Sequence, residues 1–94
     1  MILEHAILPV VPGREAAFAE AKAIIAAMPG FGGLELSRSI ETPNEYLLLV
    51  RWESVEAHDP GFRGSAQYGR WRELLHGFYA PFPVVEHFTG VALA

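Results

Sequence analysis

Residues 46–52 read YLLLVRW, and this short stretch decides the fold. It is rich in β-forming residues and follows a turn signal, which is typical of a strand. Side chains alternate across a strand, so one face receives four large side chains: Tyr46, Leu48, Val50 and Trp52. The opposite face still carries Leu47 and Leu49 beside Arg51. Both faces of the sheet that contains this strand therefore have to be covered.

Three other segments have strand character. Residues 31–40 alternate polar and apolar side chains, as a half-buried strand does. The connection 42–45 reads TPNE, with proline second in a tight turn, so these two neighbouring strands should form a hairpin. Residues 2–8 and 84–93 are short apolar segments near the two ends of the chain, and we predict that both are strands.

Helical spacing appears in two places. Residues 14–28 form one helix, ended by the Pro-Gly pair 29–30, and residues 65–76 form a second helix with Ser65 as its cap. A shorter helical turn is predicted at 54–58, with a break at the following Pro60-Gly61. The apolar positions on the buried sides of the two helices are Phe18, Ala21, Ile25 and Met28, and Tyr68, Trp71 and Leu75.

The element order β-α-β-β-α-β predicts a ferredoxin-like α+β fold in one domain spanning residues 1–94. Its four-stranded antiparallel sheet carries both helices on one face. The other face then exposes Leu47 and Leu49, whose burial would contribute about 2 kcal/mol each. The simplest cover is the same face of a second copy, so the sequence predicts a two-fold homodimer.

Composition excludes several classes of function. The chain is 51% hydrophobic, which favours self-association in a protein of 94 residues. Its net charge of −4 and its single lysine argue against a nucleic-acid partner, and we interpret Arg63, Arg70 and Arg72 as a solvated helix face. A helix needs about 20 consecutive apolar residues to span a bilayer, and no apolar run in this sequence approaches that length. We therefore expect no membrane partner. The lack of cysteine excludes thiolate metal sites and suits a cytoplasmic location.

Three motifs in their order resemble the antibiotic biosynthesis monooxygenase family: PGFGGLEL, EYLLLVRWES and SAQYGRW. The resemblance covers nearly the whole chain and implies a dimeric α+β barrel. Some members of the family oxidise polycyclic phenols with dioxygen and without a cofactor. By position, Trp52 corresponds to the tryptophan at the end of the family's third strand, and His58 lies in the histidine-bearing turn after it. Tyr68 and Trp71 correspond to the aromatic pair of the second helix.

The resemblance implies a cofactor-independent monooxygenase, an oxidoreductase that acts on a small aromatic metabolite of quinone or phenol type. Such chemistry needs an apolar pocket, a base and a donor for the developing oxyanion. We predict that His58 is the base, with a pKa within about one unit of 6.5. Tyr68 is the candidate donor, and Trp52 is the third candidate catalytic residue.

The pocket should be completed by further aromatic side chains and histidines. His5 and His87 belong to neighbouring strands and could face the same cavity. These residues also have structural interpretations: His58 can finish a helical turn, and the aromatic residues of the second helix can be core. No metal-ligand spacing is present, so we expect no metal, and the resemblance implies that no cofactor is needed. The candidate substrate-binding residues are Trp71, Phe62, His76, Tyr79, Phe82, His5 and His87.

Two departures from the family pattern leave another function open. Quinone-forming members have an asparagine four residues before the strand tryptophan, where this chain has Leu48, which cannot donate a hydrogen bond. Haem-degrading relatives have a histidine closely following the strand tryptophan. At that spacing this chain has Phe62, which argues against haem cleavage. The alternative function is a non-catalytic dimeric binding protein for an apolar small molecule. A third possibility is a dimeric protein whose sheet surface serves association only.

Overall fold

The computed structural model describes residues 1–9, 15–75 and 85–93. Its four strands and two main helices follow one another in the predicted order. Neither helix is long and apolar enough to cross a membrane in the part of the chain described. The elements are β1 (Ile2–Pro9), α1 (Glu15–Ile25), β2 (Phe31–Arg38), β3 (Glu45–Trp52), the helical turn η1 (Ala57–Phe62), α2 (Ala66–Leu75) and β4 (Val85–Thr89).

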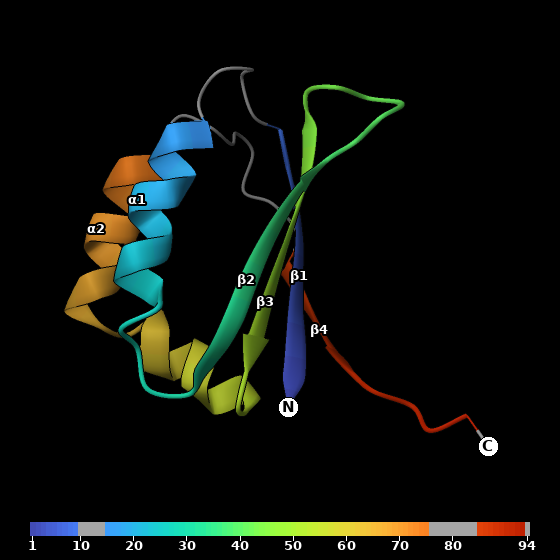
Figure 1. Cartoon of the computed structure of the whole chain (residues 1–94). Coiled ribbons are helices and arrows are strands. Elements are labelled where there is room, and N and C mark those ends of the chain that lie inside the picture. The colour runs from blue at the N-terminus through green and yellow to red at the C-terminus, as the bar shows by residue number, and fades with distance from the viewer. Residues whose placement is uncertain (10–14, 76–84, 94) are drawn as a thin grey trace.

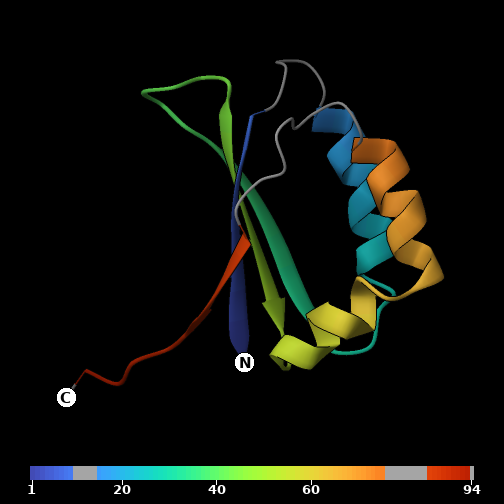
Figure 2. The same cartoon turned by 180° about the vertical axis from the view of Figure 1, so that it is seen from behind.

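The strands form one antiparallel sheet in the order β2-β3-β1-β4. Both helices lie side by side on the same face of this sheet (Figure 1), and the view from behind shows the same two layers (Figure 2). The predicted hairpin joins β2 and β3, and the two central strands are β3 and β1. The ferredoxin-like fold is therefore confirmed.

The register of β1 decides which of its side chains face the helices. Glu4 lies opposite Val50 of β3 on one side and opposite His87 of β4 on the other. Because strand side chains alternate, Glu4 points inward together with Ala6 and Leu8, and all three are buried. A carboxylate is thus placed on the inner face of a central strand.

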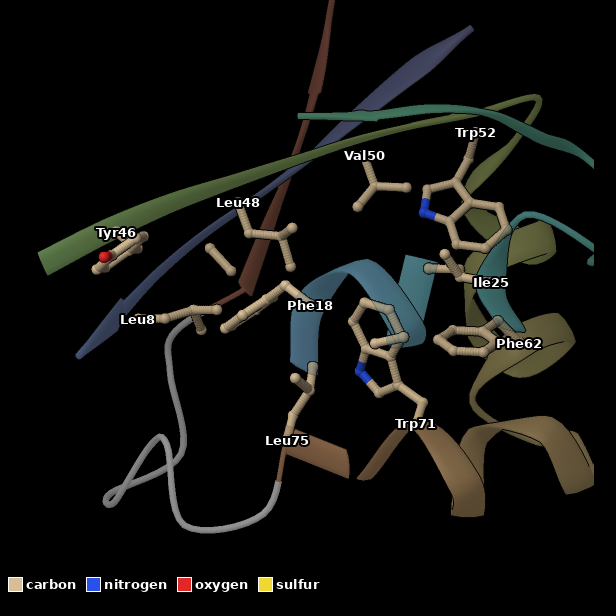
Figure 3. Packing of buried hydrophobic residues seen from close by; sticks show 12 residues of the cluster. Leu8, Phe18, Ile25, Tyr46, Leu48, Val50, Trp52, Phe62, Trp71 and Leu75 are labelled. Atoms are coloured by element: carbon tan, nitrogen blue, oxygen red, sulfur yellow. The ribbon is translucent and has the colours of Figure 1, made fainter. Parts of the chain in front are cut away.

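The core lies between this inner face and the helices (Figure 3). The four predicted inward residues of β3 are all buried, and Trp52 and Val50 have no exposed surface. From the helices, Phe18 and Ile25 of α1 and Trp71 of α2 complete the cluster. Burying each large apolar side chain stabilises the fold by about 2 kcal/mol. The alternation in YLLLVRW therefore sets the sheet's inner face.

The largest differences from the expected element boundaries concern α1, β4 and the helical turn after β3. Helix α1 ends at Ile25, because the amide nitrogens of Ala27 and Met28 bond to carbonyl oxygens three residues back and tighten the last turn. Strand β4 ends at Thr89, where its partner β1 begins at Ile2, so no strand is left to pair with residues 90–93. The helical turn after β3 extends through Phe62, with only Asp59 leaving helical angles (φ −143°, ψ 112°).

No helix of the described residues covers the outer face of the sheet (Figures 1 and 2), and this face carries apolar side chains. Leu47 and Leu49 are half-buried there, as expected from the alternation. Ile7 is 46% exposed and Phe88 is 47% exposed on the same side. The apolar patch on the outer face therefore extends beyond β3 to β1 and β4.

Candidate active site

A cavity of about 410 Å³ lies between the inner face of the sheet and the helices. This volume is within the range of small-molecule sites. Six aliphatic side chains line it: Ala6, Leu8, Ile25, Leu48, Leu75 and Val85. The rest of the wall is aromatic or ionisable: Phe62, Tyr68, Trp71, Glu4, His58, Arg63 and Arg72. The cavity can therefore hold an apolar ring next to groups that move protons.

Glu4 is the buried carboxylate of this wall, with 6% of its surface exposed. Its Oε1 accepts a hydrogen bond of 2.8 Å from Nε1 of Trp52. Trp52 pairs with Ile2 across the β1–β3 ladder, which makes it a diagonal neighbour of Glu4. The register of the two central strands thus brings an indole donor to a carboxylate 48 residues away in sequence.

His58 stands on the other side of the same carboxylate. Its Nε2 lies 3.3 Å from Oε1 of Glu4, and its ring stacks on Trp52 with centroids 5.5 Å apart. Its Nδ1 lies 2.8 Å from Nε2 of His87, which is exposed on β4. Four separate elements therefore contribute to a continuous row of polar groups: Trp52, Glu4, His58 and His87.

The positions of the protons in this row follow from the acceptor at its centre. A proton on Nε2 of His58 faces the Glu4 oxygen favourably, whereas a lone pair there would face negative charge. Nδ1 of His58 is then an acceptor, and Nε2–H of His87 donates to it. Both ring nitrogens of His58 are engaged within the protein. The Oε2 atom of Glu4 is the oxygen that remains available to the cavity.

Burial shifts the pKa values of both central groups toward their neutral forms. It raises the pKa of Glu4, and the Trp52 hydrogen bond and the charge of Arg63 oppose this rise. Burial, Arg63 and His87 lower the pKa of His58 to about 4. The expected value near 6.5 is therefore wrong, because the ring is only 3% exposed and lies inside rather than at the surface of a turn. His58 is neutral at pH 7 and contacts Glu4 without forming an ion pair.

Three of the predicted aromatic residues line the cavity: Phe62, Tyr68 and Trp71. The Phe62 ring makes edge contacts with Tyr68 at 5.2 Å and with Trp71 at 5.5 Å between centroids. Trp52 does not line the cavity, because it lies fully buried beyond Glu4. The expectation that Trp52 touches the cavity is therefore wrong, and Trp52 contacts the site through its hydrogen bond to Glu4 and its ring contacts with His58 and Phe62.

His5 and His87 lie on opposite faces of the sheet, so the expectation that they share a cavity is wrong. The antiparallel register pairs His87 with Glu4, and His5 with Glu86. His5 therefore points outward, where its ring meets Phe88 with centroids 5.4 Å apart. It lines a separate hollow of about 280 Å³ on the outer face. The remaining candidates, His76, Tyr79 and Phe82, lie outside the described residues.

Glu4 is the site residue that sequence reasoning missed. The signal was present, because Glu4 shares the alternation phase of Ala6 and Leu8 in ILEHAIL and had to face inward if they did. A carboxylate at an inward position needs partners, and such groups gather at functional sites. Among the described residues, no three His, Asp or Glu side chains are placed to hold a metal ion together.

Comparisons with known proteins agree with the fold. The sequence profile of the antibiotic biosynthesis monooxygenase family matches residues 1–74. An uncharacterised Bacillus subtilis (strain 168) protein, YczJ, is 47% identical over 95 residues, covering 97% of this chain and 100% of that protein. A crystal structure from Bordetella bronchiseptica, provisionally described as an antibiotic biosynthesis monooxygenase, is 40% identical with a TM-score of 0.89 over 97% of each chain.

A more distant structure shares the fold. SnoaB, a cofactor-independent oxygenase from Streptomyces nogalater, is 21% identical with a TM-score of 0.72, covering 98% of this chain and 92% of that chain. The profile match extends over most of the chain, and the Bordetella bronchiseptica structure matches it nearly end to end. The chain therefore belongs to the antibiotic biosynthesis monooxygenase family.

Proposed function

We propose that the protein is a cofactor-independent monooxygenase that oxidises a small aromatic metabolite of phenol or quinone type. Membership of the family and the monooxygenase names of its structural neighbours support the reaction class. One observation carries the proposal: the Glu4–His58 pair is buried in the wall of a cavity whose other walls are largely apolar and aromatic. Ionisable groups buried at a cavity wall are a mark of acid–base sites.

The pair supplies the proton acceptor that the reaction needs. Proton transfer from a phenolic O–H to Oε2 of Glu4 leaves an electron-rich phenolate in the cavity. A carboxyl with a raised pKa is a stronger base than an ordinary one, because the apolar site disfavours its charge. His58 holds the carboxylate from the other oxygen, with His87 behind it. In this proposal His58 acts through Glu4 and not as a solitary base.

The remaining roles follow from position. Tyr68 lines the cavity and donates its hydroxyl proton as a hydrogen bond to the oxygen on which negative charge develops. Trp52 holds Glu4 in place through Nε1–H. For an anthrone, a ring CH₂ and O₂ become C=O and H₂O, so the substrate supplies all four electrons. No external reductant is required for this step.

An oxygen electrode tests this function directly. Purified protein is mixed with anthrones and hydroquinones, and oxygen uptake is measured with quinone formation followed by absorbance. We expect uptake and quinone to appear together, in a ratio of one O₂ per carbonyl formed from CH₂. If no compound that binds in the cavity increases oxygen uptake above the protein-free rate, the monooxygenase proposal is wrong.

A second candidate function is binding without turnover. Leu48 lines the cavity at a position where a polar side chain would have supplied another hydrogen-bond donor. A site with fewer donors stabilises developing charge less well, yet it still holds an apolar ring. Saturable binding of an aromatic compound with no oxygen uptake would support the binding protein.

We also propose that a second copy of the chain covers the outer face of the sheet. Leu47, Leu49, Ile7 and Phe88 make this face apolar on three strands. Arg51 and Glu35, 3.7 Å apart, add a pair of opposite charges to the same face. A self-complementary apolar patch of this kind favours a two-fold dimer. The dimer is tested below through Leu49.

A further inference from the structure

Two guanidinium groups in the cavity wall have no role in the proton transfer proposed above. Arg63 lies in the turn before α2, and Arg72 lies on α2 next to Trp71. Within the described ranges, the ion contacts are Arg51 with Glu35 and His58 with Glu4, so neither arginine is neutralised there by a carboxylate. The cavity wall thus holds two arginines that form no salt bridge in the described part of a chain whose net charge is −4.

Arg72 is held against the aromatic part of the wall. Its Cζ lies 6.0 Å from the ring centroid of Tyr68, one helical turn earlier. The Tyr68 ring in turn contacts Phe62, and both rings line the cavity. The cation of Arg72 is therefore placed beside the surface on which an aromatic ligand would rest.

Arg63 acts on the opposite, ionisable part of the wall. Its charge lowers the pKa of both Glu4 and His58, which shows that its field reaches the groups proposed to take the substrate proton. A cation in this position also stabilises negative charge on a ligand. Arg63 and Arg72 therefore add two guanidinium groups to the wall of the cavity.

We infer that the substrate is an aromatic anion, a phenol that carries a carboxylate bound by Arg63 and Arg72. Guanidinium groups bind carboxylates through paired N–H donors. The aliphatic side chains Leu8, Leu48 and Leu75 take the ring. The inference rests on the proposed function, because it names the class of substrate for the same cavity.

Titration calorimetry with two probes of equal shape tests the inference. The probes are 3-hydroxy-2-naphthoate and 3-hydroxy-2-naphthamide, which differ in the negative charge. We expect the naphthoate to bind at least roughly tenfold more tightly than the amide, since hydrogen bonds to charged groups are the stronger kind. Raising the salt concentration should weaken binding of the naphthoate alone, because screening acts on the charge.

Variants identify the residues responsible. Arg63→Gln and Arg72→Gln should each lower the naphthoate affinity by roughly tenfold and leave the amide affinity within about twofold. The matched control is Arg70→Gln, because Arg70 lies on the same helix outside the cavity wall. It should leave both affinities within about twofold. All three side chains are exposed, so the fold should survive each change, which circular dichroism checks.

Three results overturn the inference: no measurable binding of the naphthoate, equal affinities for the two probes, or a preference kept by both arginine variants. The proposed function fails separately. If the naphthoate is preferred but no compound increases oxygen uptake, the anion site stands and the monooxygenase proposal falls. If neutral phenols are oxidised and the charge has no effect on binding, the monooxygenase stands and the anion site falls.

Discussion

Nδ1 of His58 lies 2.8 Å from Nε2 of His87, so a buried imidazole is connected to one at the surface. The two residues are 29 positions apart in sequence. On its other side, His58 contacts Glu4, whose carboxylate lines the cavity. The pairing provides a route by which the charge state of the cavity wall can respond to a group in contact with solvent.

Removing His87 should raise the pKa of His58. The positive charge of His87 opposes protonation of His58, and His87→Ala removes it. The pKa of His58 is followed by NMR of the imidazole signals during an acid titration, starting from about 4 in the unmodified protein. His5→Ala is the control, because His5 lies on the outer face. A His58 titration that is the same in both variants would contradict the coupling.

The stability of the protein should decrease as pH falls from about 6.5 toward 4. The folded pKa of His58 is depressed to about 4, so below pH 6.5 the unfolded chain binds a proton that the folded chain refuses. This loss approaches about 3 kcal/mol at its limit. Glu4 acts in the opposite sense: its raised pKa makes the folded state bind more protons than the unfolded state above pH 4.5.

Urea unfolding at several pH values measures this balance. His58→Phe should flatten the decrease between pH 6.5 and 4, because it removes the group that the unfolded chain protonates. Glu4→Gln should make stability fall more steeply with decreasing pH in the same range, because it removes the carboxyl group whose proton uptake favours the folded state. A pH dependence that is the same in His58→Phe as in the unmodified protein would show that the burial argument for His58 is wrong.

Loss of the Glu4–His58 pair should abolish most turnover. Glu4→Gln keeps an oxygen acceptor for Trp52 but cannot take a proton, so we expect turnover to fall by roughly a hundredfold or more. His58→Ala should cause a loss of similar order, together with some loss of stability, because the residue is buried. Glu20→Gln on the exposed side of α1 is the control. Full turnover in Glu4→Gln would refute the assigned base.

Tyr68→Phe should lower kcat more than it changes substrate affinity. The variant removes one hydroxyl from the cavity wall and leaves the ring contacts with Phe62 in place. A donor to developing negative charge acts mainly in the transition state, so the loss appears in kcat. Steady-state oxygen uptake gives both constants. A rise in KM with unchanged kcat would instead assign the hydroxyl to substrate binding.

Leu49→Asp should dissociate or unfold the protein, because a carboxylate without a partner would be buried between the two sheets of a dimer. Sedimentation at micromolar concentration measures the assembly. The control is Ile40→Asp, because Ile40 is 90% exposed in the β2–β3 connection and lies beyond the paired strands. A stable monomer in the unmodified protein at this concentration would disprove the proposed dimer.

The sequence by itself determined the order of the elements and the faces of the strands. The period of two in YLLLVRW placed Trp52 and Val50 inward and Leu47 and Leu49 outward, because alternation is a property of the extended backbone. Helical spacing likewise placed Phe18, Ile25 and Trp71 toward the sheet. These local rules were sufficient for the ferredoxin-like fold.

Only the tertiary structure decided the site. Contacts such as that between Glu4 and Trp52, 48 residues apart, depend on strand register, which no local pattern specifies. The register between β1 and β4 separated His5 from His87 and placed His87 on the inner face, where it contacts His58. Burial then held His58 neutral, because removing an imidazole from water disfavours its charged form. Residue identity shows which groups can carry protons, whereas their neighbours and their distance from water decide which of them do so.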